Sequence, residues 1–457
     1  MTSTMSGAHA VPFDLVIEGG TLVTPGGMVH ADVGIRGGLI VAIGDLSGVR
    51  TAEILDVGGA HVLPGVIDAQ VHFREPGLTH KEDLATGTTA AVLGGVTAVL
   101  EMPNTDPPTT SAAALADKVA RLEGRARCDV GFFIGATAEN ANELGQLEGL
   151  PGCCGVKVFM GSSTGTLLVA DDETLASVFA SGTRRIALHA EDEDRLRERK
   201  SLAAPGDVAS HPLWRDAETA LRATWRALAL ARRFGRRVHI LHVSSAEELD
   251  VLVGCKDLAT FEILPQYLTL AAPDCYHQLG TRAQMNPPIR DRRHQDALWS
   301  AIRSGLCDMI ATDHAPHTLE EKARPYPQSP SGMPGVQTML PIMLDHVAAG
   351  RLTLERLVDL LCAGPARVWG LAGKGRLVVG ADADLTIVDL SARRTIRDAD
   401  MASRCGWTPF DGREVTGWPV ATIVRGHIAM RDGQVDGEPH GRALRYIDTL
   451  PPNPPGA

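Results

Sequence analysis

Short runs of apolar, β-branched residues alternate with amphipathic stretches through the middle of this chain. Eight runs have the length of a strand, at 62–72, 95–102, 128–135, 154–160, 184–190, 237–243, 259–265 and 308–313. The stretches between them have helical periodicity, as in SAAALADKVARLEG and RDAETALRATWRALALARRFG. Strands that alternate with helices are typical of βα units and a parallel sheet. Eight such units over roughly 300 residues predict an α/β fold, the (β/α)₈ TIM barrel.

Both ends of the chain show a different pattern, in which short alternating segments are separated by glycines. Glycine pairs between residues 14 and 60 suit tight turns between strands. The same pattern returns after residue 372, in GRLVVGADADLTIVDL and ATIVRGHIAMRDGQV. We therefore expect a small β-sandwich domain built from both termini. The expected divisions are a small β domain at 1–61 and 371–440, the barrel at 62–370, and a Pro-rich tail at 441–457.

Composition and charge place the chain among ordinary globular enzymes. Of its 457 residues, 44% are hydrophobic and 22% are charged, which is enough apolar material for a large core. The net charge of −11 disfavours a general nucleic-acid or anionic-membrane binder. The cysteines contain no C-x-x-C pair, which indicates reduced thiols. Because the chain lacks a long apolar run and MTSTMSGAHAVPFD lacks signal-peptide features, we expect a cytoplasmic protein.

Ionisable residues lie within or at the end of five of the predicted strands. These residues are His72, Lys157, His189, His242 and Asp313. TIM barrels place their active sites at the C-terminal ends of the strands. Any one of these histidines could be an ordinary hydrogen-bonded core residue. Five ionisable residues on five separate strands favour an active site instead.

Lys157 is the most informative of these residues because it lies inside a predicted buried strand, between two valines. A charged, unpaired lysine there would cost several kcal/mol. Its amine could be neutral, form a Schiff base, or be carboxylated by CO₂ to an anionic carbamate. A carbamate can bridge two divalent cations, to which His189 and His242 would add neutral imidazoles. Asp313 would then hold a water and accept its proton. A Schiff base needs none of these partners, so we favour the carbamate.

Six motifs follow one another along the chain. PGVIDAQVHFREPGLTHKEDLATGTTAAVLGGVTAVLEMPNTDPP comes first, and GVKVFMGSSTG, LHAE, LHVSSAEE, MNPPIRD and ATDHAPHTLEEK follow. In this order they resemble the motifs of dihydroorotases of the amidohydrolase superfamily. The glycine-rich ends are similar to that family's small composite domain, so the resemblance covers nearly the whole chain. It implies zinc-dependent, reversible cyclisation of N-carbamoyl-L-aspartate to L-dihydroorotate, a step of de novo pyrimidine biosynthesis.

The resemblance also implies a role for each ionisable residue. In the family, the lysine that matches Lys157 is commonly carboxylated and bridges two zinc ions. His189 and His242 match the ligands of one zinc ion, and His72 and Asp313 match ligands of the other. The aspartate that matches Asp313 is also the catalytic general base and acid.

On the substrate side, Arg74 and Asn104 match residues that hold the substrate carboxylate, and Asn286 and His317 complete the substrate pocket. A guanidinium can bind a carboxylate through two hydrogen bonds, which a neutral cyclic diamide does not need. Hydantoinases and dihydropyrimidinases act on neutral rings and lack the FREPG pattern, and allantoinases usually lack the arginine. Other interpretations stay open: Arg74 as a solvated loop charge, Asn104 and Asn286 as turn residues, and His317 as a support for Asp313.

One position departs from the family pattern of Asp-x-His-x-His. This chain has Asp68-Ala-Gln70-Val-His72, so an amide stands where a metal-binding imidazole is expected. An amide oxygen is a weaker zinc ligand, so the half of the site with His72 and Asp313 should hold zinc less well. The chain would then have two zinc ions with reduced affinity, a single zinc ion on the other half, or no catalysis. We therefore expect one or two zinc ions per chain.

Two alternatives to dihydroorotase stay open. The chain could be a non-catalytic, dihydroorotase-like scaffold that associates with another pyrimidine-pathway enzyme, or a cyclic amidase of the allantoinase or hydantoinase type. As partners we expect a small anionic substrate and a second copy of the chain in a homodimer, but neither nucleic acid nor membrane.

Four further interpretations concern residues outside the proposed site. The Gly-, Pro- and Ser-rich segment 323–336 is a candidate lid. Strand alternation predicts that His239 faces away from His242, outside the barrel. His211 before a proline suggests a loop residue, and the acidic run AEDEDRLRERK suggests a solvated helix start.

Overall fold

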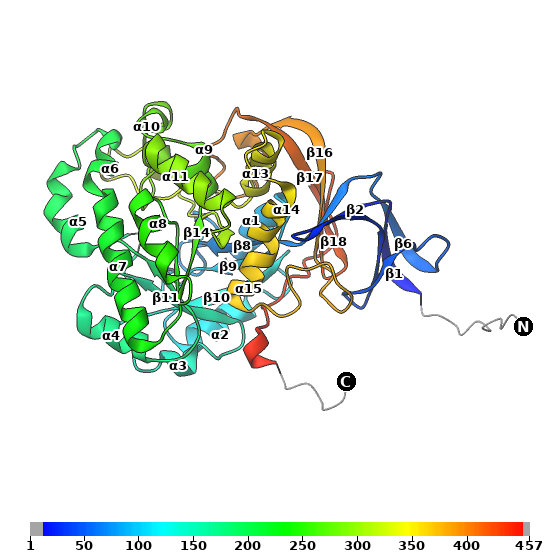
Figure 1. Ribbon diagram of the computed structural model, residues 1–457, viewed down its shortest axis with the longest axis horizontal. Coiled ribbons are helices and arrows are strands. Elements are labelled where there is room, and N and C mark those ends of the chain that lie inside the picture. Colours follow the sequence, from blue (N-terminus) through cyan, green and yellow to red (C-terminus); the bar gives the residue numbers. More distant parts are fainter. Residues whose placement is uncertain (1–11, 164, 451–457) are drawn as a thin grey trace, which may run out of the picture.

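The computed structural model describes residues 12–163 and 165–450. Figure 1 shows a barrel surrounded by helices, with a β domain beside it in which the first strands of the chain lie next to the last. Residues 1–11, which include most of the MTSTMSGAHAVPFD segment, and the last seven residues of the expected tail lie outside the described residues. Within the described part of the chain, no helix combines the length and the apolar character that a membrane span requires.

Eight parallel strands form the barrel, in the order in which they follow along the chain. They are β8 (Val66–Val71), β9 (Val96–Glu101), β10 (Asp129–Gly135), β11 (Cys153–Phe159), β12 (Ile186–His189), β13 (Val238–Ile240), β14 (Ala259–Ile263) and β15 (Met309–Ile310). The last strand meets the first through backbone hydrogen bonds from His72 to His314 (2.7 Å) and from His314 to Gln70 (3.2 Å). The predicted TIM barrel is confirmed, and each predicted run overlaps one of its strands, although β11 begins at Cys153, one residue before the run predicted at 154–160.

Helices connect the strands and cover the outside of the barrel (Figure 1). They are α1 (Leu84–Leu93), α2 (Ala112–Ala120), α3 (Leu144–Leu147), α4 (Asp172–Ala180), α5 (Glu193–Arg199), α6 (His211–Trp214), α7 (Ala217–Phe234), α8 (Ala246–Leu252), α9 (Pro265–Thr269), α10 (Asp274–Leu279), α11 (Arg292–Arg303), α12 (Leu319–Lys322), α13 (Met339–Ala348), α14 (Leu354–Val358) and α15 (Gly364–Trp369). The longest, α7, begins where the Asp216 side chain accepts a hydrogen bond from Thr219 N and ends at the left-handed Gly235.

The small β domain consists of two sheets. The four-stranded sheet has the order β5 (Leu39–Gly44), β4 (Asp32–Arg36), β1 (Phe13–Glu18) and β6 (Thr51–Asp56). The seven-stranded sheet has the order β19 (Gln434–Val435), β18 (His427–Arg431), β17 (Glu414–Val424), β16 (Leu385–Thr395), β7 (His61–Pro64), β2 (Thr21–Thr24) and β3 (Gly27–His30). The second sheet draws strands from both ends of the chain, which confirms the composite β domain.

The chain passes from this domain into the barrel at Gly65. The strand before it, β7, pairs with β16 and β2 of the seven-stranded sheet, whereas β8 pairs with β9 in the barrel. A side chain at position 65 would collide with Thr97 and Asp384, so only glycine allows the two strands to follow one another here.

Residues 441–450 lie against the end of the barrel opposite the strand C-termini. Their backbone pairs with β10 at Ala443 and, at Tyr446, with Leu371 just after α15. Leu444 and Tyr446 belong to the same buried apolar cluster as Ile67, Ala98, Phe133 and Ala187 of four barrel strands. These residues close the N-terminal end of the barrel interior.

Candidate active site

The residues expected at strand ends converge on one small pocket at the C-terminal end of the barrel. Its volume is about 20 Å³. Its lining includes Gln70, His72, Arg74, Asn104, Lys157, His189, His242, Asn286 and Asp313. His317 is the one expected site residue outside this lining, and it lies behind Arg74, with its Nε2 3.4 Å from an Arg74 Nη atom.

Strand alternation explains why Lys157 and His189 face this pocket. Val156 and Val158 of β11, and Leu188 of β12, pack in the outer apolar cluster that includes helix residues. Because neighbouring residues of a strand point to opposite faces, Lys157 and His189 point inward.

Backbone strain concentrates at the pocket. Among the described residues, five non-glycine residues have positive φ, and three of them are Arg74 (64°), His242 (41°) and Asp313 (47°). This left-handed region is unfavourable for residues with a side chain and is held by the surrounding structure. The strained backbone directs these three side chains into the pocket after each strand has ended.

One half of the site contains a pair of imidazoles and the residues that orient them. His189 Nδ1 lies 3.0 Å from His242 Nε2, and His189 Nε2 lies 2.9 Å from Glu191 Oε2. Burial alone would raise the pKa of Glu191. The charge of Arg215 and the hydrogen bond with His189 outweigh this effect and lower the pKa to about 2. The ionised Glu191 accepts a hydrogen bond from His189 Nε2–H, so the lone pair on His189 Nδ1 faces His242. Burial also lowers the pKa of both imidazoles, which favours their neutral form.

The other half of the site is built around the carboxylate of Asp313. Its Oδ1 lies 3.0 Å from His72 Nε2 and accepts a hydrogen bond of 3.1 Å from Gln70 Nε2. His72 Nδ1 lies 2.6 Å from Asn104 Oδ1, an acceptor, so His72 carries its proton on Nδ1. The lone pair on His72 Nε2 then faces the Asp313 carboxylate. Burial lowers the pKa of His72, so a proton between these two atoms is disfavoured.

Lys157 lies between these halves and is 1% exposed. Its Nζ is 4.4 Å from the ring centroid of Phe159, and no carboxylate of the described residues forms an ion pair with it. Burial lowers the pKa of Lys157 to about 7, against the smaller opposing effects of Asp313 and Glu262. An uncharged amine is therefore accessible near neutral pH.

These residues fit a divalent cation. Buried neutral imidazoles whose lone pairs face another imidazole or a carboxylate are the arrangement that a metal ion stabilises. His242 Nδ1 is also buried without a hydrogen-bond partner among the described residues. Nitrogen and carboxylate ligands of this kind suit zinc among the common metals.

A second group of carboxylates, at the junction of barrel and β domain, has a different role. Asp129, Asp382 and Asp384 surround the ammonium of Lys374, whose Nζ lies 2.7 Å, 3.1 Å and 2.5 Å from them. Lys374 already neutralises much of their charge in the place a cation would take. We therefore interpret this cluster as a structural ion-pair network.

Arg74 is buried beside the pocket, with 1% of its surface exposed. Its Nε donates to the carbonyl oxygen of Pro316 at 3.2 Å, and no carboxylate of the described residues forms an ion pair with it. Burial lowers the pKa of Arg74 to about 10, so it stays protonated at neutral pH. Arg74 is therefore not a solvated loop charge.

The structure adds two supporting residues that were read differently from the sequence. His211 is not a simple loop residue, because it is fully buried, with Nε2 3.0 Å from Asn286 Oδ1 and Nδ1 3.2 Å from the Tyr326 hydroxyl. Glu191 was grouped with a solvated acidic run, yet none of its surface is exposed. Because Glu191 lies two residues after His189, it could have been predicted from the sequence as a carboxylate that orients a histidine.

The placement of His239 outside the barrel is wrong. Val238 and Ile240 pack in the outer cluster, so His239 faces inward, where its Nε2 lies 3.0 Å from Glu262 Oε2. Strand alternation ends at Ile240, and the positive φ of His242 turns that residue inward as well. The prediction failed because it extended strand geometry past the end of the strand.

The expected lid segment contributes two residues to the pocket wall, Ser331 and Gly332. The buried ammonium of Lys322 donates to the carbonyl oxygens of Gln284 (3.1 Å), Pro330 (2.8 Å) and Gly332 (3.0 Å). These bonds hold this part of the segment against the barrel. Whether the segment closes over a substrate stays a prediction.

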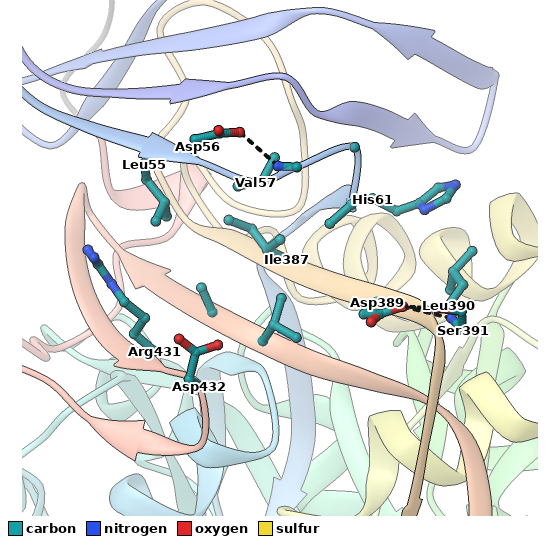
Figure 2. Close-up of a pocket in the computed structure, with 15 residues that line it drawn as sticks. Leu55, Asp56, Val57, His61, Ile387, Asp389, Leu390, Ser391, Arg431 and Asp432 are labelled. Carbon is teal, nitrogen blue, oxygen red and sulfur yellow. Dashed lines mark hydrogen bonds between the residues drawn. The ribbon is translucent and has the colours of Figure 1, made fainter.

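A much larger cavity, of about 780 Å³, lies in the β domain between β6, β16, β17 and β18. Figure 2 shows apolar side chains such as Leu55 and Ile387 on its walls, with Arg431, Asp432, Asp389 and His61 around them. Its lining contains one histidine and no group of converging imidazoles. The small pocket in the barrel therefore remains the candidate active site, because it contains the candidate metal ligands and this larger cavity does not.

Comparisons with known proteins found a matching family model and similar chains. A model of the amidohydrolase family matches residues 61–429. The chain is 38% identical over 400 residues to a dihydroorotase from Halobacterium salinarum, with 84% of this chain and 89% of the relative covered. It is 37% identical over 448 residues to an allantoinase from Rubrobacter xylanophilus, with 95% and 98% covered.

Among solved structures, an L-hydantoinase (dihydropyrimidinase) from Arthrobacter aurescens superimposes with a TM-score of 0.90. The two chains share 31% identity, over 94% of this chain and 99% of the other.

Proposed function

This chain belongs to the amidohydrolase family and is a hydrolase of cyclic amides, and we propose that it is a zinc-dependent dihydroorotase. The proposed reaction is the reversible cyclisation of N-carbamoyl-L-aspartate to L-dihydroorotate, in de novo pyrimidine biosynthesis. Relatives named dihydroorotase, allantoinase and hydantoinase are similarly close, so overall similarity does not choose among these substrates. The choice rests on the chemistry of one residue, Arg74.

Arg74 supports an anionic substrate. Among the described residues, the hydrogen-bond partners of Arg74 are a carbonyl oxygen and an imidazole, and Asp313, Glu101 and Glu321 attract it only from further away. A buried guanidinium usually has a directly bound negative charge that offsets its desolvation. The carboxylate of dihydroorotate would supply that charge through paired hydrogen bonds. Hydantoin and allantoin rings carry no carboxylate and would leave Arg74 unpaired.

The proposal includes zinc held by residues already in place. Lys157, His189 and His242 would hold one ion, and His72 and Asp313 are positioned for a second. Zinc, when bound, lowers the pKa of water toward neutrality and polarises a carbonyl. The uncharged amine of Lys157 would react with CO₂ to form a carbamate, whose oxygen atoms are better zinc ligands than the amine.

The remaining steps fall to the side chains of the chain. Asp313 accepts a proton from the attacking water in the hydrolytic direction and returns it to the ring nitrogen that leaves. Asn104 fixes the proton of His72 on Nδ1, which keeps the Nε2 lone pair toward Asp313. Arg74 anchors the substrate carboxylate, and Asn286, oriented by His211, contacts the ring.

A substrate panel with an Arg74 variant tests this proposal. We expect the wild-type enzyme to hydrolyse dihydroorotate in preference to hydantoin and allantoin. Arg74→Met should lower kcat/KM for dihydroorotate by a factor that corresponds to a free-energy loss of about 2–5 kcal/mol, because it removes one partner of a buried charge pair. Arg303→Met, at the end of α11, is the matched control and should keep full activity.

Two results would overturn the proposal. Preferred turnover of a neutral ring by both the wild type and Arg74→Met would favour the second candidate, a cyclic amidase of the allantoinase or hydantoinase type, which the close allantoinase relatives also support. Lack of turnover by a zinc-loaded sample would favour the scaffold, which binds another pyrimidine-pathway enzyme. We further propose a homodimer, to be checked by light scattering.

A further inference from the structure

We infer that Gln70 is a hydrogen-bonding residue of the substrate pocket rather than a metal ligand, and that the chain holds a single tightly bound metal ion, on Lys157, His189 and His242. The inference rests on the proposed metal dependence but not on the identity of the substrate. It concerns the position at which this chain departs from the Asp-x-His-x-His pattern.

The hydrogen bonds of Gln70 determine the orientation of its amide. Its Nε2 donates to Asp313 Oδ1 at 3.1 Å, and its Oε1 is buried without a partner among the described residues. A flipped amide would bring Oε1 against the carboxylate oxygen, where two acceptors repel, and would leave a donor unpaired instead. Gln70 therefore presents a proton to Asp313 where an imidazole would present a lone pair to a metal ion.

The two halves of the site differ in the groups that orient their ligands. His189 donates to Glu191, which forms a buried ion pair with Arg215, and this carboxylate raises the electron density on the imidazole. The corresponding partner of His72, at its Nδ1, is the neutral amide of Asn104. With Gln70 donating to Asp313, the half around His72 has fewer free lone pairs and weaker support, so a metal ion there binds less tightly.

The buried Oε1 of Gln70 has a natural partner in the substrate. Gln70 lines the pocket beside Asp313, and a buried acceptor without a donor is unfavourable by about 1–3 kcal/mol. Cyclic amides carry ring N–H groups, which are donors of the required kind. We therefore assign Oε1 to a ring N–H, so that Gln70 connects the catalytic carboxylate to the ring on which it acts.

Metal content distinguishes the two roles without reference to catalysis. Wild type, Gln70→His and Gln70→Leu would be produced with zinc and bicarbonate, dialysed against a weak chelator, and measured for zinc per chain by elemental analysis. We expect about one zinc ion in the wild type, about two in Gln70→His, and still about one in Gln70→Leu. Thermal unfolding of all three confirms that each variant is folded.

Two results would overturn the inference. Two tightly held zinc ions in the wild type, or the loss of one in Gln70→Leu, would make the amide a ligand. The second part is tested by kinetics, since loss of the Oε1 contact in Gln70→Leu should raise KM for the cyclic substrate several-fold, and an unchanged KM would contradict it. A failed substrate assignment would leave the zinc counts unaffected, so the two proposals fail separately.

Discussion

The two halves of the active site contain similar ligands but differ in how those ligands are held. His189 is fixed by an ionised glutamate that is itself paired with Arg215, whereas His72 is fixed by a neutral asparagine and faces a carboxylate shared with Gln70. The comparison shows that a histidine in a barrel does not by itself define a metal site. The partner of its second nitrogen decides how strong a ligand it is.

We expect the largest effect from replacing Asp313, the carboxylate of the half that also contains His72. We call this the weaker half and the half with His189 and His242 the stronger half. Asp313→Asn keeps the shape of the side chain and can still accept the hydrogen bond from Gln70, but it cannot take up a proton. We expect kcat to fall by about 10²–10⁴-fold, with zinc retained on the other half. Steady-state kinetics and zinc analysis of the same sample provide the check. Activity within a few-fold of the wild type would exclude Asp313 as the base.

The stronger half can be weakened through its orienting carboxylate. Glu191→Gln keeps a hydrogen-bond acceptor for His189 but removes the negative charge, so zinc affinity should fall by about 10–100-fold in a chelator competition. Glu248→Gln is a matched control, because Glu248 is an equally buried glutamate at the start of α8, bonded to Ser245 and Thr224. Equal losses of affinity in both variants would contradict the proposed role of Glu191.

Removing the residue that orients His72 in the weaker half should have a smaller effect than Glu191→Gln. Asn104→Ala removes the acceptor that fixes the proton of His72, and the loss of one such hydrogen bond is worth about 0.5–1.5 kcal/mol in kcat/KM. Zinc affinity should stay at the wild-type value, because the tightly bound ion is on the other half. A drop in zinc affinity as large as that of Glu191→Gln would show that the two halves are equivalent.

A substitution outside both halves provides the baseline. Arg431 lies beside the large cavity in Figure 2 and pairs with Glu53 at 2.9 Å on the protein surface. Arg431→Ala should reduce the free energy of unfolding by less than about 1 kcal/mol, with turnover unchanged. A denaturation curve and a rate measurement test this prediction. A marked loss of turnover would indicate that changes at the cavity affect catalysis in the active site.

Local patterns in the sequence predicted the fold and the main site residues. Each barrel strand is a short apolar run followed by a helix, so the alternation of strands and helices is visible in the sequence. His72, Lys157 and His189 could then be placed by their positions along these runs. His317 was expected in the pocket, and the structure places it behind Arg74, in contact with that residue.

Residues whose positions depend on distant contacts or unusual backbone could not be predicted in this way. His211 reaches Asn286 only because the start of α6 and a segment 75 positions further along the chain meet beside the pocket. His239 and His242 both point inward because the backbone leaves the strand between them. Such turns are fixed by tertiary packing and leave no periodic signal.

The closure of the barrel interior by Leu444 and Tyr446 has a consequence for biosynthesis. These residues are translated after all eight barrel strands, yet they cover apolar side chains from strands made much earlier. Until this segment has left the ribosome, the N-terminal end of the nascent barrel interior stays open to water. A polypeptide released before the segment is made would therefore expose an apolar surface that promotes aggregation.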